Sequence, residues 1–88
     1  MKSKTWFVYI IENDKGHLYT GITTDVNRRF EEHLNSKKGA KFFRISKPVA
    51  ILYKREFSNR SLASSFEREV KKMRRSEKLL LIKGEGSK

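Results

Sequence analysis

The sequence contains no cysteine and one proline among its 88 residues. The absence of cysteine excludes disulfide bonds and thiolate metal sites, and nothing indicates an oxidising compartment. A membrane-spanning helix needs roughly 18 consecutive apolar residues. The longest apolar run here, residues 6–11, has only the length of a strand. The first five residues are not followed by an apolar leader segment, so we expect no secretory signal and a cytoplasmic protein.

Acidic residues are also scarce, since 10 Asp and Glu stand against 21 Lys and Arg and give a formal net charge of +11. The excess is uneven. Residues 1–33 are neutral overall, whereas residues 34–60 contain eight basic side chains and one acidic side chain. A polyanion is therefore the expected partner, with nucleic acid ahead of an anionic membrane. The candidate phosphate contacts are Lys37, Lys38, Lys41, Arg44 and Lys47. Phe42 and Phe43 lie between them, and either base stacking or burial in the core fits their position.

The length allows one domain, which we place at residues 1–84, followed by a disordered tail at 85–88. Alternating and β-branched residues predict three strands, at 5–11, 17–22 and 49–57. Helical periodicity predicts helices at 25–35 and 61–74, one helical turn near 39–44, and a final helix capped by Ser76 and ended by Gly84. This order predicts an α+β fold with a small three-stranded antiparallel sheet flanked by helices.

Two tyrosines lie on the first two predicted strands. Tyr9 and Tyr19 share a face of the sheet only if the residue numbers of each cross-strand pair add up to an even number. A sum of 28, for example, would centre the turn on Asp14. Two phenols on one face could orient a water molecule or accept its proton. From the pattern alone, the ordinary role of tyrosine as a strand residue is favoured.

The predicted helix at 25–35 has an apolar stripe formed by Val26, Phe30 and Leu34. At about 100° per residue, Arg29 and His33 lie along one edge of this stripe. An arginine held at the edge of a core suits bidentate binding of phosphate. From the pattern alone, an arginine with its charge in solvent and a half-buried histidine is the favoured interpretation.

The predicted helix at 61–74 has a second apolar stripe, formed by Leu62, Phe66, Val70 and Met73. Glu67 falls just outside the stripe and Glu69 falls inside it. Either carboxylate could contribute to a Mg²⁺ site. An ion pair between Glu67 and Lys71 one turn later is the ordinary alternative. Helical phase does not choose between the two glutamates.

These residues together resemble the GIY-YIG nuclease superfamily, most closely its small, stand-alone bacterial members. The first motif corresponds to Phe7-Val8-Tyr9, with Phe7 and Val8 in place of the usual Gly and Ile, and the second to Tyr19-Thr20-Gly21. The most specific stretch is residues 19–33. Residues 38–41, and residues 61–63 leading to Glu67, are also similar, so the resemblance covers about residues 5–75.

The resemblance implies a Mg²⁺-dependent nuclease that hydrolyses phosphodiester bonds in DNA, rather than RNA, such as a repair or recombination intermediate. It implies that Tyr9 and Tyr19 are catalytic and that Gly21 permits close packing beneath them. Arg29 would stabilise charge on the scissile phosphate, and His33 would move a proton or contact the phosphate. The resemblance selects Glu67 as the metal ligand.

Two other functions compete with the nuclease. One is a nucleic-acid-binding module that keeps the fold without cleaving. The other is a basic accessory protein of a ribonucleoprotein, which explains the charge but not the paired tyrosines. We expect a monomer without a membrane association.

Overall fold

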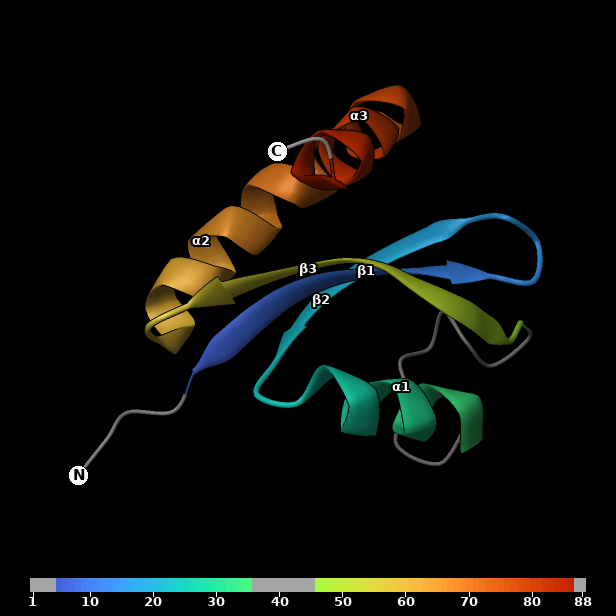
Figure 1. The fold of residues 1–88 in the computed structure, drawn as a ribbon, viewed down its shortest axis with the longest axis horizontal. Helices are drawn as coiled ribbons and strands as arrows, with labels where there is room; N and C mark the ends of the chain where they lie inside the picture. Colours follow the sequence, from blue (N-terminus) through green and yellow to red (C-terminus); the bar gives the residue numbers. More distant parts are fainter. Residues whose placement is uncertain (1–4, 36–45, 87–88) are drawn as a thin grey trace.

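The structure is a computed structural model that describes residues 5–35 and 46–86 (Figure 1). Its sheet has three antiparallel strands in the order β2-β1-β3. The strands are β1 (Trp6–Asn13), β2 (Leu18–Thr23) and β3 (Pro48–Phe57), and the helices are α1 (Val26–Asn35), α2 (Arg60–Lys71) and α3 (Arg75–Gly86). The predicted α+β class is confirmed. The turn expected near 39–44 lies outside the described residues.

The hairpin of β1 and β2 places the two tyrosines on one face of the sheet. The Asn13 side-chain oxygen accepts hydrogen bonds from the backbone amides of Lys15 and His17, at 3.0 and 2.7 Å. Tyr9 lies opposite Gly21 and Tyr19 opposite Ile11. The residue numbers of each cross-strand pair therefore add up to 30, an even number, as a shared face requires. The turn is centred on Lys15, one residue after the Asp14 that the example sum of 28 would give.

Helices cover both faces of the sheet, α1 on one face and α2 with α3 on the other (Figure 1). On the α1 face, Tyr9 and Ile11 pack against Val26. On the opposite face, Ile10 packs with Tyr53 and Val70. Successive residues of β1 are buried because β1 is the central strand and its side chains alternate between two covered faces. This arrangement makes β2 and β3 the edge strands.

The apolar stripe predicted for α1 is wrong at one end. Leu34 is 41% exposed, whereas His33 is fully buried. Asp25 starts the helix, because its carboxylate accepts a hydrogen bond from the backbone amide of Arg28 at 3.0 Å. The buried face of α1 is therefore rotated away from Leu34 toward Arg29 and His33.

The prediction for α2 is wrong in the same way. Leu62 is 50% exposed and the adjacent Ala63 is fully buried. Asn59 caps the helix by accepting a hydrogen bond from the Leu62 amide at 2.9 Å. The helix ends at Lys71, before the predicted end at residue 74.

The last helix differs at both ends from its prediction. It starts at Arg75, and the Glu77 carboxylate accepts a hydrogen bond from the Arg74 amide at 2.8 Å, which is one half of a capping box. Ser76 therefore lies inside the helix and does not cap it. Gly84 does not end it either, since α3 continues to Gly86 through part of the expected tail.

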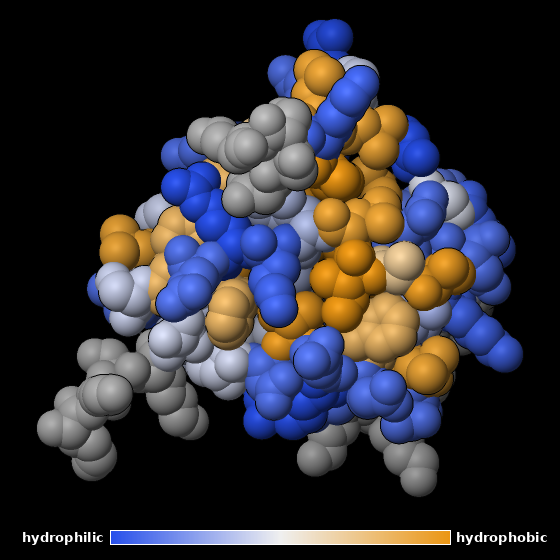
Figure 2. All heavy atoms as spheres, in the orientation of Figure 1, coloured by the Kyte–Doolittle hydropathy of each residue, from blue (hydrophilic) through white to orange (hydrophobic). Residues whose placement is uncertain are grey.

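The surface retains some apolar area. Figure 2 shows a band of hydrophobic side chains on the viewed face, bordered by hydrophilic residues. Val49, Leu79 and Leu80 are among the large exposed hydrophobic residues. Among residues 5–35 and 46–86, no helix is long and apolar enough to cross a membrane.

Candidate active site

The two tyrosines meet over a glycine of the edge strand. A Cβ atom at Gly21 would lie 2.5 Å from the Tyr9 hydroxyl oxygen and 3.2 Å from Cε2 of Tyr19. Real Cβ atoms almost never show a contact as short as the first. The missing side chain therefore allows the Tyr9 ring to lie across β2, with the Tyr19 ring centroid 6.2 Å from its own. Gly21 is therefore closely packed against both tyrosine rings.

Tyr9 is joined to α1 through a buried hydrogen bond. Its hydroxyl oxygen is 3.0 Å from Nε2 of His33. Both side chains are almost completely shielded from solvent. The His33 ring also contacts Tyr19 edge-on, with the ring centroids 5.4 Å apart. The rotation of α1 that exposes Leu34 is what brings His33 to the tyrosines.

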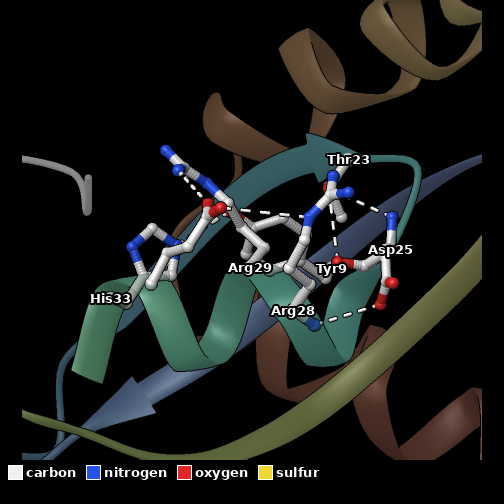
Figure 3. A network of polar contacts seen from close by, with 7 residues as sticks. Tyr9, Thr23, Asp25, Arg28, Arg29 and His33 are labelled. Atoms are coloured by element: carbon white, nitrogen blue, oxygen red, sulfur yellow. Dashed lines mark hydrogen bonds and ion pairs between the residues drawn. The ribbon is translucent and has the colours of Figure 1, made fainter. Parts of the chain in front are cut away.

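Arg29 enters the same group from the preceding turn of α1. Its guanidinium hydrogen-bonds to Tyr9 and, at 2.8 Å, to the carboxylate of Glu32. Figure 3 shows Arg29 and His33 projecting from one helix beside Tyr9. The Arg29 side chain is 28% exposed, while that of its neighbour Arg28 is 59% exposed. Arg29 therefore contacts both the buried phenol and solvent.

Burial sets the protonation states of this group. Burial and the neighbouring Tyr19 raise the pKa of Tyr9 well above its usual value, and Glu67 adds to this effect against the opposing influence of Arg29. Burial, and then the charge of Arg29, lower the pKa of His33 to about 4. Burial opposes the charge of Arg29, but hydrogen bonds to Glu32 and Tyr9 outweigh it and raise the Arg29 pKa. At neutral pH the site therefore holds a neutral phenol, a neutral imidazole and a guanidinium cation.

These states assign the direction of the buried hydrogen bond. A guanidinium only donates, so the Tyr9 oxygen accepts from Arg29. The phenol proton is then available for donation to Nε2 of His33, which places the imidazole proton on Nδ1. The arrangement is a short hydrogen-bonded chain from Arg29 through Tyr9 to His33.

Glu67 approaches from a different direction, since α2 packs on the face of the sheet opposite α1. Its carboxylate pairs with Lys71 at 3.1 Å and is 18% exposed, whereas Glu69 is an exposed residue. The charge of Glu67 nevertheless contributes to the raised Tyr9 pKa. Tyr9 extends over the edge strand β2. The Tyr9 phenol on which the charge of Glu67 acts therefore lies close to that edge.

Residues 5–35 and 46–86 contain no group of three or more His, Cys, Asp or Glu side chains that could hold a metal ion. Glu67 therefore fits a cation only in the manner typical of Mg²⁺, which uses one or two carboxylates and completes its shell with water and substrate phosphate.

Of the predicted basic contacts, only Lys47 is described. It is exposed and lies at the hairpin turn, where its backbone carbonyl accepts a hydrogen bond from the Asp14 amide at 2.9 Å. The hydrogen bonds between Lys47 and Asp14 thus tie the start of β3 to the turn and do not involve Tyr9 or Tyr19. Lys37, Lys38, Lys41 and Arg44 lie outside the described residues.

Sequence reasoning missed Glu32. This residue contacts Arg29 at 2.8 Å and lies 3.9 Å from Arg28. The signal was present, because Glu32 follows the two arginines by three and four residues and side chains at these spacings meet on a helix.

A three-stranded antiparallel sheet with paired tyrosines, one arginine and one histidine beside a strand glycine is the arrangement expected of a GIY-YIG domain. The family model described as the GIY-YIG catalytic domain matches residues 5–79. The chain belongs to this family.

Its relatives are small proteins of similar size. The chain is 44% identical over 78 residues to UPF0213 protein DP2720 of Desulfotalea psychrophila, a match covering 89% of this chain and 71% of the relative. It is 43% identical to UPF0213 protein SAV0488 of Staphylococcus aureus, over 88% of this chain and 93% of the relative. The solution NMR structure of protein EF2693 from E. faecalis is 34% identical and superposes with a TM-score of 0.68 over 99% of this chain and 92% of that chain.

Proposed function

We propose that the chain is a metal-dependent nuclease that hydrolyses phosphodiester bonds in DNA, such as those of repair or recombination intermediates. One observation carries the proposal. A buried phenol–imidazole hydrogen bond of 3.0 Å is contacted by a partly exposed guanidinium, and the three residues resemble those of the family's motifs. A purely structural domain has no need to bury a phenol and an imidazole beside a charged group at this cost.

Tyr9 and His33 provide the route for the proton of an attacking water. The raised pKa of Tyr9 disfavours a free phenolate, so Tyr9 passes its proton to Nε2 of His33 as it takes the proton of the water. The low pKa of His33 opposes this transfer in the free protein. A bound phosphodiester favours it, because a nearby negative charge raises the pKa of an imidazole.

Arg29 and Tyr19 bind and orient the substrate in this proposal. The exposed part of the Arg29 guanidinium can donate to the non-bridging oxygens of the phosphate and stabilise the charge that develops there. Tyr19 packs against both Tyr9 and His33 and is partly exposed, and in this proposal it positions the attacking water.

Glu67 would hold the divalent cation, Mg²⁺ in this proposal, together with water and substrate oxygens. When bound, the cation supplies Lewis-acid stabilisation of the leaving oxygen. In the free protein Lys71 occupies this carboxylate at 3.1 Å. The cation therefore has to compete with Lys71 for the Glu67 carboxylate. This competition is weak, because an ion pair within one helix contributes little when its lysine is largely exposed.

The decisive experiment is a panel of duplex, branched and single-stranded DNA with and without Mg²⁺, using matched variants. We expect Arg29→Ala to lower cleavage by about 10²-fold or more, as the loss of a transition-state hydrogen-bond donor does. Arg28→Ala, one residue away and pointing to solvent, should retain cleavage. Glu67→Gln should lose cleavage and Glu69→Gln should keep it. Equal effects within either pair would refute the assigned roles.

A binding module on the same fold is the second candidate, favoured by the Glu67–Lys71 ion pair and by the lack of a multi-ligand metal cluster among the described residues. The same panel decides between the two. If the wild-type protein binds these DNAs but cleaves none of them with Mg²⁺, the binding module replaces the nuclease.

A further inference from the structure

Three basic side chains at one end of the sheet lie over aromatic rings. Lys54 Nζ is 5.6 Å from the ring centroid of Phe7. Arg55 Cζ is 5.3 Å from the centroid of Phe57 and 5.0 Å from that of Phe66, and Arg60 Cζ is 5.6 Å from that of Trp6. We call Lys54, Arg55 and Arg60 the ring-stacked cations. All three are exposed residues.

The ring-stacked cations carry charge that the described part of the protein does not neutralise. Arg28, Arg29 and Lys71 each lie within 4 Å of a glutamate carboxylate. Within residues 5–35 and 46–86, no such ion pair forms at Lys54, Arg55 or Arg60. An aromatic face attracts a cation without cancelling its charge or occupying the N–H groups at its edge.

Their rings also restrict these long side chains before any ligand binds. An unrestrained lysine or arginine loses rotamer entropy when it is fixed by a ligand. Stacking on a ring removes part of that loss in advance, which favours binding by pre-organisation. The combination of held orientation, free N–H edges and uncompensated charge suits a repeated anion, and a phosphodiester backbone is such a ligand.

The ring-stacked cations lie on both sides of the edge strand β3. Lys54 is directly opposite Tyr9 in the pairing of β1 with β3 and shares its face of the sheet. Arg55, one residue later, lies on the face covered by α2, where its guanidinium stacks on Phe66. Arg60, at the start of α2, extends the cations on that face.

We propose that Lys54, Arg55 and Arg60 form a DNA-backbone contact surface around the edge strand β3 and the start of α2. This inference rests on the proposed action on DNA and extends it, because it locates binding at the end of β3 and the start of α2. It is distinct from the predicted phosphate contacts at residues 37–47.

The test measures binding without cleavage. A fluorescein-labelled DNA duplex is titrated with protein in EDTA at several salt concentrations, and anisotropy gives the affinity. We expect the double variant Arg55→Gln, Arg60→Gln to bind more weakly and to have a salt slope shallower by about 2, since each lost phosphate contact removes about 1. Lys54→Gln should lower the slope by about 1.

A matched control removes two charges elsewhere. Lys72 and Lys83 are exposed, and neither lies over an aromatic ring of the described residues. The double variant Lys72→Gln, Lys83→Gln should keep the wild-type slope. Trp6 is the only tryptophan, so its emission in the wild-type protein should change as DNA binds. Circular dichroism of each variant checks that the fold is retained.

The outcomes separate this inference from the nuclease proposal. An unchanged slope in the Arg55/Arg60 variant, or an equal loss in the control variant, overturns the contact surface even if the wild-type protein cleaves DNA. A shallower slope confined to the ring-stacked cations supports the surface even if no cleavage is found. A dependence on Arg55 and Arg60 for binding vesicles of phosphatidylserine, with none for DNA, would assign the surface to a membrane and also overturn it.

Discussion

Gly21→Ala is the sharpest perturbation of the candidate active site, since it adds one methyl group at the most crowded backbone position. The new Cβ would lie 2.5 Å from the Tyr9 hydroxyl oxygen and 2.8 Å from Cζ of the same ring. An ordinary carbon–oxygen contact is about 3.5 Å, so the hydroxyl must move by about 1 Å. The Tyr9 ring is buried between β2 and α1 and cannot swing into solvent.

The cost has two sources. Overpacking a well-packed core typically costs about 1–3 kcal/mol. A 1 Å displacement of the hydroxyl also lengthens its 3.0 Å hydrogen bond to His33, and an unsatisfied buried polar group costs about 1–3 kcal/mol. We therefore expect a loss of about 2 kcal/mol or more in the free energy of unfolding, and a fall of about 10 °C in Tm.

Gly84→Ala is the matched control, because nothing lies within 4 Å of a Cβ at Gly84 in α3. Replacing a helical glycine by alanine should stabilise the protein by about 0.5–1 kcal/mol. Urea unfolding followed by circular dichroism measures both variants, and the cleavage assay measures the displacement of Tyr9. If Gly21→Ala unfolds at the wild-type urea concentration and cleaves normally, the close packing of Tyr9 on Gly21 is refuted.

Two further predictions concern His33 and Glu32. The pKa of His33 is about 4 in the folded protein and about 6.5 in a free histidine, so the unfolded chain binds a proton first. Its contribution, up to about 3 kcal/mol, is present above pH 6.5 and is lost as the pH falls toward 4. Urea unfolding at several pH values should show this loss in wild type and in His17→Gln but not in His33→Gln, and a loss retained in His33→Gln would contradict it. Glu32→Gln weakens the 2.8 Å contact that holds Arg29. Its cleavage rate should fall while the Mg²⁺ concentration for half-maximal rate stays unchanged, with Glu31→Gln as the exposed control; normal cleavage by Glu32→Gln would exclude this positioning role.

The strands and the type of fold could be predicted because their signal is local. The residues of β1 are apolar on both sides, as a central strand covered on both faces requires. The requirement that paired residue numbers add up to an even number, which places Tyr9 and Tyr19 on one face, is also local. The particular sum, however, depends on the turn. Asn13 accepts two amide hydrogen bonds and draws the turn centre to Lys15, an effect that residue types alone do not reveal.

The helix faces were harder to predict, because hydrophobicity treats a polar side chain as exposed. The predictions that Leu34 and Leu62 are buried are wrong for the same reason. Each helix rotates to bury residues that fit the sheet, and a buried His33 is stable because Tyr9 offers it a hydrogen bond. A partner 24 residues away in the sequence leaves no trace in helical periodicity.

The sequence by itself determined the three strands, the helix order, the excess of positive charge and the family motifs, because each depends on near neighbours or on composition. Only the tertiary structure decided that His33 is buried and faces Tyr9, that Arg29 contacts both Tyr9 and Glu32, and that Glu67 comes from the opposite face of the sheet. These facts depend on which surfaces pack together. Packing depends on how whole helices and strands fit together, so no short stretch of the sequence specifies it.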